Sequence, residues 1–543
     1  MPSPSLRAPA AALAVASLLA LASCSPSPYE DESPHTSSQW HRRFVPASQT
    51  PDWSEADRDF FLNGSMSTEV VPEAVFRAWL ESEPGLFPSP TLANFGAVEG
   101  KPGDLPIGFS RRPVAHLGGL PSLGINCAAC HASEVVPAGG GTPTLILGTA
   151  APFDAEAFFG AVVVAMVKTA DPEGMKRFLP AYARALRGDE GARAMAARLE
   201  SEGAAVAAAV AEDPFANRGA AAGTLHRLTA AELDLVLPGT DSPVPLPDLA
   251  RALLRLLHNM RAALHLPDVL PASGPPPSGP GRNDAFGLLS LSLLGVPQEP
   301  APVKFGIVWN VERRRWVHWD GNTPSPMARN FLAAVGLGAP MVGNEAIVDI
   351  AVLRRQTDLS ETIRPPQYPW PVDAKRAERG KGHYEAACAR CHDGPESDAR
   401  LFAVPEVGTD PARARAFTAG QAEGFNAFLK RVRVKGWDAA REPAIRSTGK
   451  YWAADLAGVW ARAPYLHNGS VRTLADLLTA PADREKSWRR GSREYDRVAL
   501  GFTDAGAYVL DTTAPGNSSA GHDYGTGLSP DEKRDLLEYL KTR

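Results

Sequence analysis

Two short segments of the chain carry the pattern Cys-x-x-Cys-His, and no other feature restricts its fold as strongly. The first is CAACH at residues 127–131 and the second is CARCH at residues 388–392. This pattern is the attachment signature of c-type haem, in which both thiols form thioethers and the histidine binds the iron. We therefore expect two covalently bound haem c groups, with His131 and His392 as the proximal iron ligands.

The cysteine count supports haem over the other uses of a Cys-x-x-Cys pair. The chain has five cysteines, of which one is Cys24 and four lie in the two motifs, namely Cys127, Cys130, Cys388 and Cys391. None is left for a structural disulfide, although an exported protein could form one. A redox dithiol or a zinc site does not need a histidine directly after each pair, so both alternatives are disfavoured.

The N-terminal segment has the composition of a secretory signal. Arg7 is followed by an apolar run of small residues up to Ala22, which is too short to remain as a membrane-spanning helix. The run ends in Leu-Ala-Ser-Cys, which resembles a lipobox, so cleavage would leave Cys24 as a lipidated first residue. The alternative is ordinary cleavage with Cys24 incidental. We predict a signal peptide at 1–23 and a flexible Ser/Pro-rich tether at 24–50.

Length and composition describe a globular protein with more than one domain. The chain has 543 residues, of which 44% are hydrophobic, so there are enough apolar side chains for more than one core. The formal net charge of −5 offers no basic stripe for phosphates, which argues against a nucleic-acid partner.

The C-terminal part has the pattern of a cytochrome c domain. Residues 374–387 form a good helix, with a glycine and a tyrosine, directly before the second haem motif. At the other end, Ser529 and Glu532 form a capping box at the start of a leucine-striped helix. Cytochrome c domains pack such a terminal helix across the opening helix, so we predict one domain at 372–543.

An enlarged N-terminal haem domain is predicted at 51–371. After the first haem motif the sequence is rich in alanine and mostly helical in pattern, with the clearest amphipathic helix at 249–266. Residues 267–283 have the composition of a surface loop, and short strands are expected between 304 and 322. The predicted fold class is mainly α, with two cytochrome c-type haem domains and few short strands.

The sixth ligand of each iron separates an electron carrier from a catalyst. No methionine follows Met341, and only two histidines, His467 and His522, follow His392. We favour His522 because it lies in a Gly/Ser-rich loop just before the terminal helix, where cytochrome c domains deliver their distal ligand. His467 is the second possibility. The third is a five-coordinate iron, to which neither histidine binds. Two histidine ligands would make this haem a low-potential electron store.

No sixth ligand is evident for the iron at His131. We therefore expect an open or water-ligated position there, able to bind peroxide or dioxygen. Several histidines could still approach this iron, although a lone histidine is more often a hydrogen-bonded core or surface residue; they are His116, His226, His258, His265 and His318.

Three tryptophans lie between the two haem motifs in sequence. Trp309, Trp316 and Trp319 could relay electrons between the haems or form the wall of a substrate pocket. Core packing is the simpler interpretation for any one of them.

Several segments resemble dihaem cytochromes related to bacterial cytochrome c peroxidase and to rubber oxygenase. The resemblance implies two cytochrome c domains that face each other, with an N-terminal haem for reaction and a C-terminal haem for electron supply. It covers residues 95–543 in patches and leaves the Ala-rich middle unmatched. The matching segments are GDLPIGF, GINCAACH, WVHWDGNTPSPMARN, GVWARAPYLHNGSVRTLADLL and PGNSSAGHDYGTGLSPDEKRDLLEYLK.

The chain departs from the peroxidase pattern at two positions. His522 stands in the region where the peroxidases use methionine, and Arg462 stands where they have a threonine at an interdomain calcium site. Calcium is therefore doubtful, and the ligation is closer to that of the rubber oxygenases. In those enzymes the N-terminal haem binds dioxygen beside a functionally important tryptophan, for which Trp309 is the candidate here.

The sequence thus predicts a lipid-anchored haem oxidoreductase, exported to the periplasm or the cell surface. Its reactants would be peroxide or dioxygen, and its redox partner a small cytochrome or a cupredoxin. A pure electron-transfer cytochrome with two six-coordinate irons is the main alternative, and a gas-sensing haem lipoprotein is another.

Overall fold

The computed structural model describes residues 47–101, 104–216, 225, 228–236, 244–266, 278–314, 316–394 and 400–543. The signal peptide, Cys24, nearly all of the tether and His226 lie outside these residues. The chain is 47% helix and 13% strand, which confirms the prediction of a mainly helical fold. Within the described ranges, no helix is both long and apolar enough to cross a membrane.

The N-terminal unit, residues 51–371, holds the first haem motif between two small sheets. The antiparallel sheet β1-β3-β2 leads directly into the motif, because β3 ends at Ile125 and helix α4 begins at Cys127. The hairpin β4–β5 follows the motif. These elements have the bounds α2 Glu55–Asn63, β1 Val71–Pro72, α3 Glu73–Ser82, β2 Phe109–Val114, β3 Leu120–Ile125, α4 Cys127–His131, β4 Ala132–Pro137 and β5 Thr144–Leu147.

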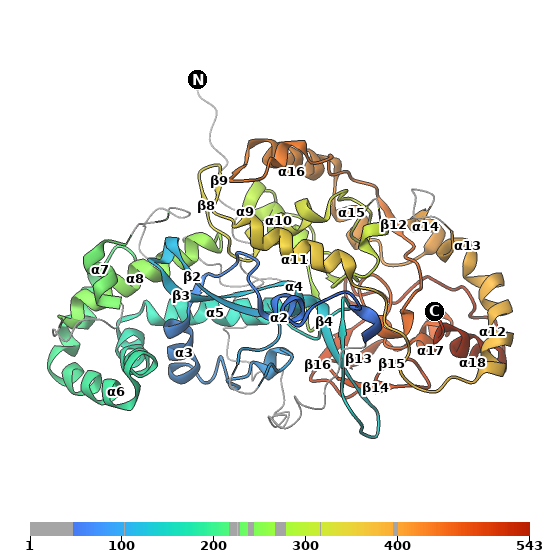
Figure 1. Ribbon diagram of the computed structural model, residues 1–543, viewed down its shortest axis with the longest axis horizontal. Helices are drawn as coiled ribbons and strands as arrows, with labels where there is room; N and C mark the ends of the chain where they lie inside the picture. Colours follow the sequence, from blue (N-terminus) through green and yellow to red (C-terminus); the bar gives the residue numbers. More distant parts are fainter. Residues whose placement is uncertain are drawn as a thin grey trace.

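The Ala-rich region forms a helical lobe at one end of the molecule (Figure 1). Helix α8 corresponds to the amphipathic helix expected at 249–266, and α6 contains a kink at Gly188, whose φ is 66°. The predicted loop 267–283 lies mostly outside the described residues. The bounds are α5 Ala155–Thr169, α6 Pro172–Glu212, α7 Ala230–Val236 and α8 Leu246–Ala263.

Between the lobe and residue 371, the described residues form the helices α9, α10 and α11 and very short strands. The strands expected between 304 and 322 are reduced to the end of β7 and an isolated bridge between Val317 and Thr323. The bounds are β6 Arg282–Asn283, α9 Ala285–Leu294, β7 Val303–Lys304, α10 Pro326–Gly336, β8 Met341–Val342, β9 Glu345–Ala346 and α11 Ile350–Thr362.

The C-terminal unit, residues 372–543, is organised around the pair of helices α12 (Ala374–Ala387) and α18 (Pro530–Leu540), which pack across each other as predicted. Gly380 permits this crossing, because a Cβ atom at this position would overlap the backbone carbonyl of Asp535. Arg379 pairs with the Asp535 carboxylate at 2.6 Å. The capping box between Ser529 and Glu532 is present at the start of α18.

The remaining elements of the C-terminal unit are short and connect this helix pair to the rest of the molecule. They are α13 Ala389–His392, β10 Leu401–Ala403, α14 Val404–Val407, α15 Ala412–Ala416, α16 Ala419–Arg431, β11 Arg433–Val434, β12 Lys450–Trp452, α17 Leu474–Leu477, β13 Ser487–Arg490, β14 Glu494–Asp496, β15 Gly501–Phe502 and β16 Tyr508–Asp511.

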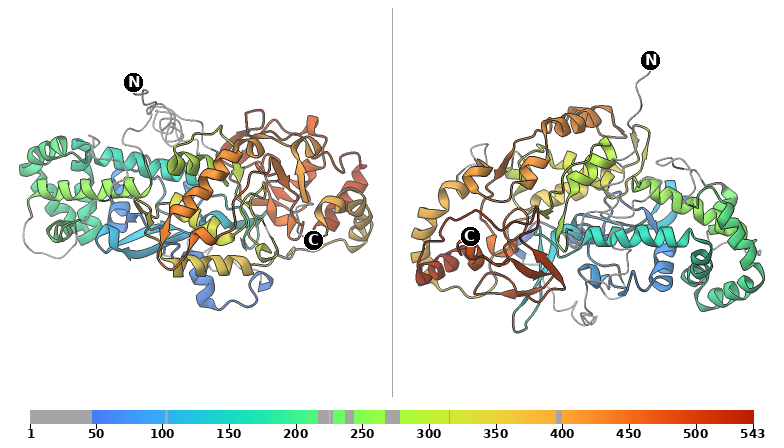
Figure 2. Two further views of the ribbon diagram at one scale, coloured as in Figure 1. Left: turned by 90° about the horizontal axis from the view of Figure 1, so that it is seen from above. Right: turned by 180° about the vertical axis from the view of Figure 1, so that it is seen from behind.

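The two units share sheets and a core. The sheet β15-β14-β4-β5 and the sheet β11-β9-β8 each contain strands from both sides of residue 371. One large hydrophobic cluster also runs through both units. Figure 2 shows the helical lobe at one end and the α12–α18 pair at the other, with the shared region between them. The predicted boundary at 371/372 therefore lies between helices but not at a gap in packing.

Candidate haem-binding sites

The second motif forms one turn of helix that faces a cavity. Helix α12 ends at Ala387, and Cys388 leaves the helical conformation with φ −120° and ψ −40° before α13 begins. This break turns Cys388, Cys391 and His392 toward the same cavity, whose wall they share. The rest of the wall is mainly apolar and includes Leu456, Leu474, Leu477, Leu478, Leu536 and Leu540.

The orientation of His392 suits an iron ligand. Its Nδ1 lies 2.7 Å from the carbonyl oxygen of Ala454. A carbonyl only accepts hydrogen bonds, so Nδ1 carries the proton and Nε2 keeps the lone pair that a metal ion needs. Burial lowers the pKa of His392, which favours the neutral form that binds metal.

His522 lies across the cavity from His392. Their ring centroids are 6.3 Å apart, with 49° between the ring planes. Two imidazoles on opposite sides of one metal ion, with metal–nitrogen bonds of about 2 Å, have centroids about 6 Å apart. The pair therefore fits the two axial positions of one haem iron.

The backbone around His522 holds its imidazole in place. His522 has a φ of 49°, an uncommon conformation for a residue with a side chain. Its N–H donates to the carbonyl of Val407 at 2.8 Å, and Arg484 donates to its carbonyl at 2.9 Å. Burial, followed by the effect of His392, lowers the pKa of His522 to about 4. The imidazole is therefore neutral near pH 7, as an iron ligand has to be.

His467 lines the same cavity but in a different role. Its ring stacks on Tyr451 with centroids 4.1 Å apart and 24° between the planes. Burial and the nearby cations Arg282, Arg413 and Lys304 lower its pKa to about 3. The cavity thus contains both sequence-predicted candidates for the sixth ligand, and His522 is the one that faces His392.

The first motif is held tightly by its neighbours. The Asn126 side chain accepts a hydrogen bond from the Ala128 N–H at 2.8 Å and donates to the carbonyl of Gly64, also at 2.8 Å. Gly108 lies so close that a Cβ atom there would overlap the backbone of Ala129. These contacts fix the turn that presents Cys127, Cys130 and His131.

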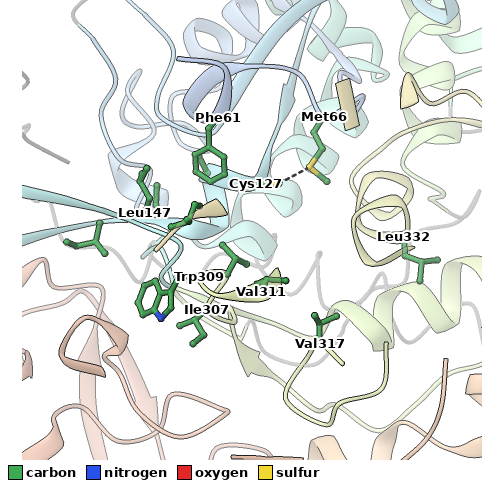
Figure 3. Packing of buried hydrophobic residues seen from close by; sticks show 14 of the residues in the cluster. Phe61, Met66, Cys127, Leu147, Ile307, Trp309, Val311, Val317 and Leu332 are labelled. Atoms are coloured by element: carbon green, nitrogen blue, oxygen red, sulfur yellow. Dashed lines mark hydrogen bonds between the residues drawn. The ribbon is translucent and has the colours of Figure 1, made fainter. Parts of the chain in front are cut away.

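In the first motif Cys127 is buried and Cys130 is partly buried. Burial raises the pKa of Cys127 to about 11 and that of Cys130 to about 12. A redox-active Cys-x-x-Cys pair needs a lowered thiol pKa, so this environment argues against a redox dithiol. The Cys127 Sγ lies 3.7 Å from the thioether sulfur of Met66 (Figure 3).

His131 has different neighbours from His392. Its ring contacts Phe305, with centroids 6.3 Å apart. Burial, followed by the charge of Arg329, lowers the pKa of His131 to about 3, and the backbone of Gly306 acts in the opposite direction. The ring contact of His131 is thus with a phenyl group, which cannot bind iron.

Of the histidines considered for the first iron, His318 lies within electrostatic range of His131. Its Nδ1 is 2.8 Å from the Asn322 side-chain oxygen and 3.1 Å from the Thr323 hydroxyl, so a lone pair for a metal ion would come from Nε2. Burial lowers its pKa to about 3, with a small contribution from His131. The others have separate surroundings: His116 lines a surface groove, His258 packs on Phe215, and His265 lies near Val335.

The tryptophans occupy distinct positions. Trp309 is fully buried, and its indole N–H donates to the carbonyl of Ala457 at 3.1 Å. It is not among the residues that line the second cavity, whereas Trp319 is. Trp319 directly follows His318, so a residue that lines the second cavity is next in sequence to one within electrostatic range of His131. The guanidinium of Arg446 lies over Trp316, and its Cζ is 3.5 Å from the centroid of the Trp316 ring.

Two residues that line the second cavity, Lys304 and Ala454, were not identified from the sequence, because no motif contains them and they meet the cavity only through the fold. Trp319 was named as a possible relay or pocket wall, and it lines this cavity. Arg462 was named only for its place at the calcium site of the peroxidases, and it also lines the cavity.

Comparison with known proteins identifies part of this site. The family described as RoxA-like, cytochrome c-like, matches residues 449–489. This segment runs from β12 through α17 and includes Ala454, Arg462 and His467, so it forms one wall of the second cavity. The chain therefore has a cytochrome c-like segment near its C-terminus, which indicates a c-type cytochrome with haem c.

Two relatives of the chain are uncharacterized proteins of Sinorhizobium fredii (strain NBRC 101917 / NGR234). The protein y4iJ is 29% identical over 356 residues, which cover 49% of this chain and 60% of y4iJ. The protein y4iM is 30% identical over 310 residues, which cover 49% of this chain and 70% of y4iM.

Proposed function

The chain belongs to the same family as the uncharacterized protein y4iM, and we propose that it is a dihaem c-type cytochrome oxidoreductase. The haem at His131 would be the site that reacts with dioxygen or peroxide. The haem at His392 would store or relay electrons.

One observation carries this proposal: the His392 and His522 rings lie 6.3 Å apart across a cavity that also contains Cys388 and Cys391. An iron with two histidine ligands has no position left for a small molecule, so it suits electron transfer. The Ala454 carbonyl fixes the His392 tautomer, and the backbone contacts of His522 fix the opposite ring.

The first site differs in a way that suits reaction. A haem bound there would supply an iron with a position for dioxygen or peroxide. His131 would hold the iron, and the partly buried Arg329, whose charge acts on both Cys127 and His131, would make the surroundings of the motif electropositive. Positive charge favours anionic oxygen species over neutral ones.

A tryptophan between the two sites would connect them. Trp319 is the better candidate for this role than Trp309, because Trp319 lines the second cavity and follows His318, which approaches the first motif. Trp309 is packed against Gly148 and Gly458, with its N–H used by the backbone, and would act by supporting the junction of the two units.

The test is spectroscopy of the purified protein followed by two assays. We expect one low-spin haem that ignores cyanide and one haem whose spectrum shifts with cyanide or peroxide. Peroxide turnover with a reduced small cytochrome or cupredoxin, and oxygen consumption with an unsaturated hydrocarbon, would then separate peroxidase from oxygenase. Two low-spin haems that both ignore cyanide and peroxide would overturn the catalytic proposal.

His318 supports a second candidate, a pure electron-transfer cytochrome. It is partly buried within electrostatic range of His131 and keeps Nε2 available, so it could complete the coordination of the first iron. Two six-coordinate irons would carry electrons without reacting with oxygen species.

We also propose that the mature protein is exported and anchored to a membrane by a lipid on Cys24. The lipobox-like sequence before Cys24 supports this. In cells fed a labelled fatty acid, the wild-type chain should carry label and sediment with membranes. C24A should lose the label, and a labelled C24A chain would contradict the anchor.

A further inference from the structure

A small cavity lies between the strand that follows the first haem motif and the C-terminal unit. Its volume is about 30 Å³, which is room for one or two water molecules or for one monatomic ion. Its wall includes Ser133 of β4, Pro280, Gly281 and Arg490 at the end of β13. No residue of either haem motif lines it, although Ser133 is only two residues from His131. The cavity is therefore distinct from both candidate haem sites.

Arg490 carries a positive charge into the wall of this cavity. It is 2% exposed, and its guanidinium donates to the carbonyl of Pro280 at 2.9 and 3.1 Å and to that of Gly469. Three of its five N–H groups are used in this way, which leaves two for a ligand. Within the described part of the chain, Arg490 forms no ion pair with a carboxylate. Carbonyl groups stabilise a cation but carry no opposite charge, so this setting favours an anion nearby.

A second buried cation, Arg282, adds to the positive charge near the cavity. It is 1% exposed, and it donates to the Asn517 side-chain oxygen at 2.6 Å. Burial, followed by the charge of Arg282, lowers the pKa of Arg490 well below its usual value. Tyr508 and Asp154 act in the opposite direction, but burial raises the pKa of Tyr508, so its phenol is neutral near pH 7. Asp154 has a smaller effect on Arg490 than Arg282 has, so the potential at the cavity is positive.

The wall also contains a hydroxyl group that has no hydrogen-bond partner. Ser133 is 1% exposed, and no group of the described residues forms a hydrogen bond with its Oγ. A buried hydroxyl without a partner costs free energy, so a ligand inside the cavity is expected to complete it. A hydroxyl donates to an anion as well as to a carbonyl oxygen, so Ser133 and Arg490 can act on the same ligand.

We propose that this cavity binds a small monovalent anion, of the chemical class of chloride, between Ser133 and Arg490. The guanidinium would supply the charge and two N–H groups, and the serine hydroxyl would supply a third donor. A volume of about 30 Å³ excludes polyatomic anions as large as gluconate. The site needs no haem, so this inference is independent of the proposed function.

The anion would join the two units beside the first haem motif. Strand β4, which contains Ser133, directly follows the motif and pairs with β14 of the C-terminal unit. Arg490 ends β13 of the same unit. A ligand that binds the folded chain but not the unfolded chain raises the stability of the folded state, so chloride should strengthen this junction.

Bromide, which stands in for chloride and has an anomalous X-ray signal, gives the direct test. Crystals of the full-length holoprotein, grown without chloride, are soaked in sodium bromide and measured at the bromine edge. We expect an anomalous peak within hydrogen-bond distance of both the Ser133 Oγ and a terminal nitrogen of Arg490. A cavity that holds only water, with no anomalous peak, would overturn the proposal.

A solution experiment measures the contribution of Ser133. The unfolding temperature of the wild-type holoprotein should rise as sodium chloride replaces sodium gluconate at constant ionic strength. S133A should need about tenfold more chloride for the same rise, because one hydrogen bond to the anion is lost. S201A is the control, since the Ser201 hydroxyl is exposed and donates to the Arg198 carbonyl, and it should respond like wild type.

The outcomes separate the site from a general salt effect. A wild-type protein that does not respond to chloride, or an S133A protein with the same chloride response as wild type, would overturn the proposed site. If S133A does not fold, the bromide experiment on the wild-type crystal decides the matter, because it needs no variant.

Discussion

The two haem motifs are the same five-residue pattern in different surroundings. The ring 6.3 Å from His392 is an imidazole, that of His522, whereas the ring 6.3 Å from His131 is the phenyl group of Phe305. The first ring can bind iron and the second cannot. In the proposed function the pattern would therefore provide attachment and the proximal ligand, and residues far away in sequence would decide what each iron is able to do.

The electrostatics of the two sites differ as well. The cation at the first motif is the partly buried Arg329, whose charge acts on Cys127 and His131 themselves. At the second cavity the cations Lys304 and Arg462 lie on the wall, away from the motif in sequence. One arrangement places positive charge beside the histidine of the motif, and the other places it on the wall of the cavity.

Removing the thiols of one motif gives the largest expected effect. C388S/C391S should reduce the attached haem from two per chain to one and abolish the low-spin signal. C127S/C130S should also leave one haem, but with the low-spin signal intact. Pyridine haemochrome assay and mass spectrometry measure the count. A low-spin signal that survives C388S/C391S would reverse the assignment of roles.

Replacing His522 tests whether this residue is the sixth ligand that distinguishes the second haem site from the first. In H522A the second iron should lose its sixth ligand and become high-spin, because the imidazole that faces His392 is removed. H467A is the matched control, since His467 lines the same cavity but stacks on Tyr451, and it should stay low-spin. Electron paramagnetic resonance distinguishes the two states. A low-spin H522A with a high-spin H467A would make His467 the ligand.

Replacing His318 tests whether the two haem sites differ in their sixth ligand at all. If the first iron is open, H318A should keep its spin state and still bind cyanide, because no coordinate bond has been lost. H116A is the control, as His116 lines a surface groove. A first haem that is low-spin in wild type and becomes high-spin only in H318A would favour the electron-transfer alternative.

The sequence predicted the parts of this molecule that depend on local patterns. Helices α12 and α18 and the capping box at Ser529 follow from residues close together in the chain, whose helical preferences and side-chain hydrogen bonds act locally. The sheets across residue 371 could not be predicted, since β4 pairs with β14 more than three hundred residues later. Lys304 and Arg462 meet for the same reason: their proximity depends on long-range packing, which no spacing rule encodes.

Substitutions at Gly380 and Gly382 test how much the crossing of α12 and α18 stabilises the protein beside the second motif. G380A should destabilise the protein by about 3 kcal/mol, because the new methyl group would overlap the Asp535 carbonyl where α18 crosses α12. G382A is the control on the same helix, where a Cβ atom meets nothing, and it should be neutral or stabilising by about 0.5 kcal/mol. Denaturant unfolding followed at the haem band compares them. Equal stability of the two variants would contradict the crossing.

Titratable groups in the two units should make the free energy of unfolding depend on pH in opposite directions. In the C-terminal unit, Arg379 and then Arg376 hold the pKa of Asp535 below its usual value, although burial opposes them. The contribution of this ion pair is present above the unfolded-state pKa and is lost as pH falls through the folded-state value. D535N should remove this acid-sensitive contribution to the free energy of unfolding.

Glu156 of the N-terminal unit has the reverse dependence. Burial raises its pKa to about 7, although the N–H groups of Ser278 and Asp284 donate to it. Its folded form therefore binds a proton more tightly than the unfolded chain between about pH 4.5 and pH 7, and stability falls as pH rises through that window, by about 2 kcal/mol between pH 5 and pH 7. E156Q should flatten this decline while leaving the acid limb set by Asp535 in place. An E156Q profile that falls as steeply as wild type over pH 5–7 would show that another group controls the N-terminal unit.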